Sequence, residues 1–217
     1  MHSRLEEKLD LYKDLLIRML KEVEQALLLS IQAVENRDQE LAANIVQHDI
    51  SINRLRDMAE HDGVMILVTE APYAHYLRQA VAGLKITGEI ERMGDYASHL
   101  AHVGASLIHT KEVDTIITLV CDMASSAVQM IKMVQKTLDE GQSDPARVVA
   151  KMDDDIDAKR YLINDLLGRT PASDESERRA FYACYYLTKE MERLGDHITN
   201  ICEWMVYTVE GVRPKLN

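Results

Sequence analysis

The chain has 217 residues, of which 47% are hydrophobic and 28% are charged, so it holds enough apolar material for a core and global disorder is excluded. Aromatic residues make up only 5%, and the 9 glycines and 4 prolines are few, which favours helices over a β-sandwich or a β-barrel. The formal net charge of −11 argues against nucleic acid or anionic lipid as the main ligand and favours a basic protein partner or bound cations.

The first half of the chain predicts three helices. Apolar residues recur every three or four positions over residues 3–34, which predicts one long helix. Asp38 is a suitable N-cap for a second helix, in which His61-Asp62-Gly63 predicts an end or a bend. Pro72 suits the first turn of a third helix, which we expect over residues 72–109.

The second half predicts three more helices. A fourth helix begins at Lys111 and ends at a break over residues 141–145, where Asp144 is the expected N-cap of the fifth. The fifth helix continues to Leu167, and after a loop the sixth runs to Glu210. No segment alternates apolar and polar residues with period two, so we expect six long helices and no strands.

Cysteine usage and hydropathy predict the compartment. The three cysteines are widely spaced and form no CxxC motif, which favours a reducing cytoplasm over a disulfide framework. The first ten residues, MHSRLEEKLD, lack the apolar stretch of a signal peptide. The best candidate for a membrane span, Gly63–Val68, is far too short to cross a bilayer. We therefore expect a cytoplasmic protein without direct membrane insertion.

The second half of the chain repeats the first. Residues 89–100 are EIERMGDYASHL and residues 190–201 are EMERLGDHITNI, with five of twelve positions identical at an offset of 101. The preceding helix carries a second echo at an offset of 104, because DISIN at residues 49–53 matches DDDID at residues 153–157. Two elements in the same order and at nearly the same spacing indicate an internal repeat.

A repeat of about 100 residues is too long for a solenoid unit. It suits two similar three-helix bundles in tandem, and we place the boundary between residues 1–109 and 110–217. No polar linker stands near residues 105–115, so we expect the two bundles to share one continuous body. The predicted fold class is all-α.

Each repeat places two carboxylates four residues apart on one helix face, namely Glu91 with Asp95 and Glu192 with Asp196. Like charges at that spacing repel, so an arginine or a cation is expected to offset them. Arg92 and Arg193 are possible anchors or plain surface residues. The oxygen and imidazole donors that these helices and the neighbouring 153–157 segment gather are Glu91, Asp95, His99, His102, Asp153, Asp157, Glu192 and Asp196.

A divalent or trivalent cation neutralises such carboxylates best, since oxygen-rich sites suit hard or borderline metals. Gly94 and Gly195 interrupt the same helices, and a mid-helix glycine costs roughly 1 kcal/mol relative to alanine unless something approaches the backbone closely. The alternative is that these carboxylates form ordinary solvated acidic faces. Among the remaining histidines, His197 shows no partner spacing and is expected at the surface or in a cap.

The duplicated Glu-Arg-hydrophobic-Gly-Asp signature, the D-x-x-x-D/N element and the ICEW segment at residues 201–204 resemble the PhoU family, regulators of bacterial phosphate uptake. The resemblance covers essentially the whole chain. It implies two three-helix bundles of PhoU type and a cytoplasmic negative regulator of phosphate transport and of the phosphate-starvation response. The implied partners are the ATPase subunit of the phosphate ABC transporter and the associated sensor histidine kinase.

The resemblance also implies multinuclear metal clusters at the repeated E/DxxxD motifs. Carried over by position, the ligands are Asp49, Glu91, Asp95, Asp153, Asp157, Glu192 and Asp196. The chain departs from the pattern at Asn53, and His99 and His102 stand where the second repeat has Asn200 and Glu203. Iron, zinc, manganese and nickel are the expected metals, and the two histidines shift the first cluster towards zinc or nickel.

The chain lacks the P-loop, GxSxG and HExxH signatures, which favours a regulator and adaptor over an enzyme. The alternative is a carboxylate-bridged metalloenzyme, either a dimetal oxidase or a hydrolase, although the Glu-x-x-His motif of ferritin-like sites does not occur. A coiled-coil scaffold is a third possibility, but a scaffold does not need repeated mid-helix glycines. Long amphipathic helices also favour a homodimer.

Overall fold

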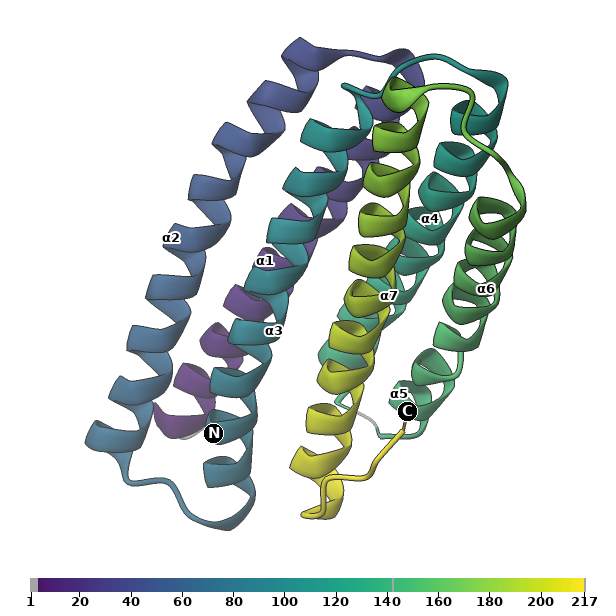
Figure 1. The fold of residues 1–217 in the computed structure, drawn as a ribbon. Helices are drawn as coiled ribbons and strands as arrows, with labels where there is room; N and C mark the ends of the chain where they lie inside the picture. The colour runs from purple at the N-terminus through teal and green to yellow at the C-terminus, as the bar shows by residue number, and fades with distance from the viewer. Residues whose placement is uncertain (1–3, 142, 217) are drawn as a thin grey trace.

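The structure is a computed structural model that describes residues 4–141 and 143–216. In this part of the chain all regular secondary structure is helical. The elements are α1 (Arg4–Asn36), α2 (Gln39–Glu70), α3 (Ala74–Gly104), α4 (Lys111–Glu140), α5 (Asp144–Ala150), α6 (Asp153–Arg169) and α7 (Glu175–Glu210). The first three helices form one bundle and the remaining ones form a second (Figure 1), which confirms the predicted all-α fold with two three-helix repeats.

The two bundles meet along α3 and α7, which lie side by side and run in opposite directions (Figure 1). α1 also packs against α4, while α2 and α6 flank the molecule on opposite sides. Buried apolar residues from both bundles form one contiguous cluster, as expected for a shared body. The boundary at residues 109 and 110 falls in the loop between α3 and α4 and stays a prediction.

α2 continues through Gly63 to Glu70, so the helix end considered at residues 61–63 is wrong. A Cβ atom on Gly63 would lie 2.6 Å from Cδ2 of Leu84 and 2.7 Å from the hydroxyl oxygen of Tyr12. Glycine is therefore needed here for close packing of α1 and α3 against α2, rather than for a turn. At the start of the same helix Asp38 caps as predicted, accepting a hydrogen bond from the Leu41 backbone N–H at 2.9 Å.

The predicted fifth helix is two helices in the structure. The chain turns at Lys151 and Met152, where the Met152 backbone N–H bonds to the Val149 carbonyl at 2.9 Å, and α6 then begins at Asp153. Asp144 is the first residue of α5 and Ser143 holds the N-cap position, so the predicted cap was wrong by one residue. The turn places three aspartates in the first turn of α6, where the helix dipole favours negative charge.

α4 is long and apolar enough to cross a membrane by length and composition alone, with a mean hydropathy of 1.4 over 18 residues. The prediction that Gly63–Val68 is the best candidate for a membrane span was therefore wrong. Of that window, 56% is buried inside the protein, and the buried side carries Ile116, Val120 and Met123. These residues belong to the contiguous core of the two bundles, so α4 packs as the core helix of the second repeat.

Candidate functional site

The ligands predicted in the second repeat, here called the second acidic cluster, are Asp153 and Asp157 on α6 and Glu192 and Asp196 on α7. These two helices pack against each other. Asp153, in the first turn of α6, is only 5% exposed. Its Oδ1 atom lies 2.0 Å from the position that a Cβ atom on Gly195 would take. The glycine in the middle of α7 therefore leaves room for a buried carboxylate from the neighbouring helix, which is the close approach that the sequence pattern indicates.

The first acidic cluster consists of Asp49 on α2 with Glu91, Asp95 and His99 on α3. It repeats this arrangement, with more space around the mid-helix glycine. A Cβ atom on Gly94 would lie 3.1 Å from Cδ1 of Ile52 and 3.4 Å from Oδ1 of Asp49. Asp49 is half-buried, whereas its counterpart Asp153 is buried. The two glycines thus occupy equivalent positions, and the approach of the aspartate is tighter in the second repeat.

An arginine bridges the helices in each cluster. Arg160 on α6 lies 3.1 Å from Oε1 of Glu192 through Nη1 and 3.5 Å from Oδ1 of Asp157 through Nε. Arg56 on α2 donates from Nη1 to Oε1 of Glu91 at 3.0 Å. These guanidinium groups neutralise the first carboxylate of each E-x-x-x-D pair.

Sequence reasoning missed both bridging arginines and considered Arg92 and Arg193, which are exposed on the structure. The repeat offset could have identified these two arginines. Arg56 and Arg160 are separated by 104 residues, which is the offset that relates the DISIN and DDDID segments.

Like charges concentrate in the first cluster. Burial raises the pKa of Asp49, the charge of Glu91 raises it further, and a hydrogen bond from the Asn53 amide at 2.9 Å opposes the shift. Burial also raises the pKa of Asp95, and the charges of Glu91 and Asp49 add to that increase. His99 and nearby arginines oppose both shifts, so a positive charge at this cluster is stabilising.

Two histidine–glutamate pairs cross the contact between the repeats. Nδ1 of His99 lies 2.8 Å from Oε1 of Glu190, and Nδ1 of His197 lies 2.5 Å from Oε2 of Glu89. The Asn200 amide donates to the same Glu89 oxygen at 3.3 Å, which is the symmetry counterpart of the His99 contact at the 101-residue offset. The expectation that His197 is a surface or capping residue was wrong, because its side chain is 17% exposed and paired.

The structure gathers the predicted ligands in two groups. Asp49, Glu91, Asp95 and His99 act on one another electrostatically between α2 and α3. In the second group, Asp153, Asp157 and Glu192 lie at the α6–α7 contact, and Asp196 is half-buried on α7, one helical turn beyond Glu192. His102 is exposed on α3.

The donor chemistry of both groups fits a cation, and Gly195 provides space for a carboxylate that any larger residue would displace. Within residues 4–141 and 143–216, no three His, Cys, Asp or Glu side chains stand at the spacing of a metal site. Arg56 and Arg160 hold Glu91 and Glu192 instead. A cation therefore has to compete with these guanidinium groups for the same oxygens.

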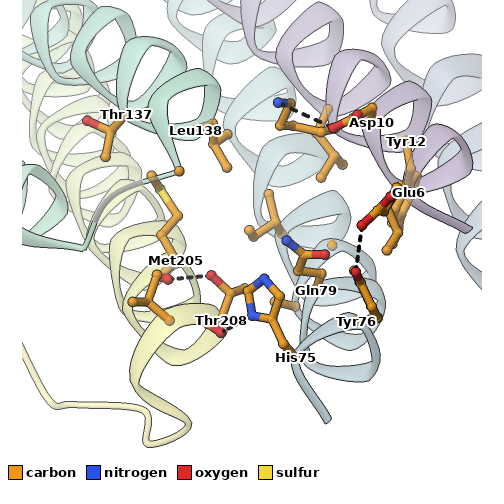
Figure 2. A pocket seen from close by; sticks show the side chains of 18 residues that line it. Glu6, Asp10, Tyr12, His75, Tyr76, Gln79, Thr137, Leu138, Met205 and Thr208 are labelled. Carbon is orange, nitrogen blue, oxygen red and sulfur yellow. Dashed lines mark hydrogen bonds and ion pairs between the residues drawn. The ribbon is translucent and has the colours of Figure 1, made fainter. Parts of the chain in front are cut away.

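A cavity of about 310 Å³ lies apart from both clusters, among α1, α3, α4 and α7 (Figure 2). Leu9 and Met205 contribute apolar surface, and Glu6 accepts a hydrogen bond from the Tyr76 hydroxyl at 2.7 Å at one side. His75 contacts the Thr208 carbonyl at 3.1 Å, which links α3 to α7 beside the cavity. None of the predicted metal ligands lines this space.

Comparison with known proteins gives consistent matches. The family model described as PhoU domain matches twice, over residues 16–103 and 120–205. A relative from Clostridium acetobutylicum, named phosphate-specific transport system accessory protein PhoU homolog, is 29% identical over 204 residues, which cover 93% of this chain and 92% of the relative. The crystal structure of PhoU from Pseudomonas aeruginosa superposes with a TM-score of 0.88 at 24% identity, covering 96% of this chain and 100% of that one. PhoU from Streptococcus pneumoniae gives 0.85 at 21% identity, with 98% and 100% covered.

Proposed function

The chain belongs to the PhoU family, and we propose that it is a cytoplasmic negative regulator of phosphate uptake and of the phosphate-starvation response. The relatives that it resembles over nearly their whole length are named accessory proteins of the phosphate-specific transport system. The proposed partners are the ATPase subunit of the phosphate ABC transporter and the sensor histidine kinase that reports phosphate supply. The proposed role is docking without catalysis.

One observation carries the proposal. Both copies of the family domain keep the same construction, in which a mid-helix glycine faces an aspartate of the neighbouring helix and an arginine bridges to the first carboxylate. A construction that is kept in both copies presents two related acidic surfaces to a partner. Docking that differs between phosphate-replete and phosphate-starved states would bias the conformational equilibria of transporter and kinase.

The test is a pull-down of the transporter ATPase subunit at high and at low phosphate. We expect capture that changes with phosphate and that weakens when Glu192 and Asp196 are replaced by glutamine and asparagine. The matched control replaces exposed Asp154 by asparagine, which removes one charge beside the cluster. Equal capture in both phosphate states, or none in either, contradicts the proposal.

We also propose that each cluster binds iron, zinc, manganese or nickel. Support comes from the donor set and, in the first cluster, from the raised pKa of Asp49 and Asp95, which burial raises first and the charge of Glu91 raises further, so that a cation would relieve the repulsion. The bound ion would supply positive charge in place of the bridging guanidinium groups. Metal analysis of protein purified without an affinity tag tests this, and protein with less than one ion per chain after equilibration with each metal contradicts it.

The metalloenzyme alternative has a direct test of its own. Oxygen consumption or phosphatase turnover by iron-loaded protein would contradict a role without catalysis. Asp95→Asn and Asp196→Asn variants would then show whether the turnover depends on the two clusters.

We further propose a homodimer formed through the outer side of α2. Support comes from apolar side chains that stand exposed along this helix, among them Val46, Ile50, Met58, Val64 and Val68. Sedimentation of wild type and Ile50→Asp tests the proposal, with exposed Gln47→Asp as the control for added charge. A monomeric wild type, or a dimer unaffected by Ile50→Asp, contradicts it.

A further inference from the structure

The C-terminal strap, residues 211–216, folds back along α7 after the helix ends. Gly211 caps α7 with φ of 78°, a left-handed conformation that suits glycine and reverses the chain. The strap then rises beside α5 (Figure 1). Arg213 and Leu216 consequently contact residues of α7 that precede them by ten or more positions.

Both carboxylate oxygens of Glu203 are bonded to the strap. Nη2 of Arg213 lies 2.7 Å from Oε2 of Glu203, and the Leu216 backbone N–H donates to Oε1 at 2.9 Å. The same guanidinium donates to Oδ1 of Asn200 at 2.9 Å and stacks 4.5 Å from the ring centroid of Trp204. Glu203 is 7% exposed with the strap in place, so the strap both covers this carboxylate and supplies hydrogen-bond donors to its two oxygens.

The site favours a guanidinium group. Nη2 of Arg213 contacts both the Glu203 carboxylate and the Asn200 amide oxygen, and its guanidinium carbon lies 4.5 Å from the Trp204 ring centroid. The weakly hydrated guanidinium group suits such a ring contact better than an ammonium group does, so arginine is favoured over lysine. Asn200, Glu203 and Trp204 all project from one rigid helix. The surface that binds the arginine is therefore preformed, whatever supplies the guanidinium.

The strap itself is lightly held. Val212 is 70% exposed, Lys215 is exposed, and the side chain of Arg213 keeps 38% of its surface in solvent. Leu216 packs against the core and is the main apolar contact of the strap. A segment with so little buried apolar surface opens at a small fraction of the free energy of global unfolding.

The first repeat has no equivalent of this surface. At the 101-residue offset, His99, His102 and Val103 replace Asn200, Glu203 and Trp204. Neither the duplication nor the packing of the three-helix repeat requires the arginine-binding surface. It is a property of the second repeat alone.

We propose that Asn200, Glu203 and Trp204 form a recognition site for an arginine side chain, which Arg213 fills in the resting chain and an arginine-bearing extended segment of a protein partner fills on docking. A chain with a net charge of −11 attracts basic segments, and this site selects among them by guanidinium geometry. The partner segment would displace the strap, since both use the same two carboxylate oxygens.

The test uses the chain of 217 residues and needs neither phosphate nor metal, so its outcome is independent of the regulatory role proposed above. Trp204 is the only tryptophan, so intrinsic fluorescence reports directly on the site. The probe is a synthetic peptide with the sequence of residues 211–216. In Arg213→Ala we expect a red-shifted emission and peptide binding at least about tenfold tighter than in wild type, where the attached strap competes at high effective concentration.

Two further variants identify the contacts. Glu203→Gln combined with Arg213→Ala is expected to abolish peptide binding. Asn200→Ala combined with Arg213→Ala is expected to weaken peptide binding, and this variant provides the test if the glutamine variant does not fold. A peptide with lysine in place of arginine is expected to bind less tightly. Arg178→Ala, which removes an exposed arginine of α7 paired with Glu175, is the control for loss of one positive charge.

Several results would overturn the proposal. An unchanged Trp204 emission in Arg213→Ala means that the strap does not occupy the site in solution. Equal affinity of the peptide for wild type and for Arg213→Ala would show that the strap does not compete for the site. Equal affinity of the arginine and lysine peptides would show that the site does not select arginine. Concentration-dependent association of wild type that is lost in Arg213→Ala assigns the site to the strap of a second copy and excludes a separate partner.

Discussion

The two acidic clusters share a backbone plan and differ in how their charge is neutralised. In the second repeat Asp153 is buried against Gly195, and Arg160 serves both Asp157 and Glu192. In the first repeat the Asn53 amide takes the place of the second aspartate. The mid-helix glycine therefore determines how closely the helices approach, while the residue at the last position of the D-x-x-x-D/N element, Asn53 or Asp157, changes the charge of the cluster.

The helix faces that carry the E-x-x-x-D pairs, here called the acidic stripes, run from Glu91 to His102 on α3 and from Glu192 to Glu203 on α7. The ends of these two stripes differ even more than the clusters do. The second stripe ends at Glu203, which is buried beneath the strap, whereas the first ends at His102, which is exposed. The first repeat thus presents an open stripe with imidazole groups, and the second presents a closed one with an arginine already bound. A partner or a cation meets different chemistry on the two halves of one molecule.

The largest expected effect separates the two glycines. Gly195→Ala places a Cβ atom 2.0 Å from the Asp153 carboxylate and should destabilise the fold by about 2 kcal/mol, in the range of overpacked cores. Gly94→Ala meets the flexible end of Ile52 at 3.1 Å and gains helix propensity, so its net effect should stay within about 1 kcal/mol. Urea unfolding measures both, and equal losses would contradict the difference in tightness.

The second largest expected effect is a loss of metal affinity that differs between the two clusters. Asp196→Ala and Asp95→Ala should each lower metal affinity by about tenfold or more, because both remove a proposed ligand. The loss should be larger for Asp196→Ala, because the first repeat keeps His99 beside Asp49 and Asp95 as a substitute donor. Asp154→Ala, an exposed neighbour of the second cluster, is the control. A larger loss in Asp95→Ala would reverse the proposed ranking.

Much of this comparison can be predicted from the sequence, because it depends on local pattern. Apolar spacing predicts the long helices, and the two offsets of 101 and 104 predict the duplicated bundle. The same offset of 104 identifies Arg56 and Arg160 once the repeat is known. These features involve residues whose roles follow from their own helix or from the repeat.

The features that the sequence does not predict depend on contacts between distant segments. Gly63 suggests a helix end until Leu84 and the Tyr12 hydroxyl are placed against it. The pairing of His99 with Glu190 requires knowledge that α3 and α7 run antiparallel. Arg213 follows a helix stop and gives no sign of folding back onto Glu203. Only tertiary packing brings these groups together.

A smaller effect is expected from pH. Because burial raises the folded-state pKa of Asp95 above its ordinary value of 3.8, the folded chain binds more protons than the unfolded chain just above that value. The ionised carboxylate therefore lowers stability at neutral pH, and this cost shrinks as the pH falls through the folded pKa and is gone below the ordinary value of 3.8. Asp95→Asn should raise the free energy of unfolding at pH 7 by less than about 1 kcal/mol, since the group is partly solvated.

The measurement is the difference between Asp95→Asn and wild type in urea unfolding at pH 7 and at about pH 4, close to the ordinary aspartate pKa of 3.8. The stabilisation should shrink at the lower pH. Asp154→Asn, which changes an exposed carboxylate, should show no such trend. A stabilisation that stays constant with pH would mean that the substitution acts through packing instead of charge.

The smallest expected difference is the one between the two bridging arginines. Arg160→Gln removes a cation that pairs with two carboxylates of its cluster, whereas Arg56→Gln removes one that pairs with a single cluster carboxylate, Glu91, and with the exposed Asp57 outside the cluster. Both arginines are partly solvated, so each loss should stay near about 0.5–1 kcal/mol, with the larger value for Arg160→Gln. A double-mutant cycle with Glu192→Gln should return a coupling energy greater than the cycle of Arg56 with Glu91, because Arg160 is the less exposed of the two, at 19% against 31%. Equal coupling energies would show that burial of the guanidinium does not distinguish the two repeats, and the difference between them would then reside in the glycine contacts and the strap.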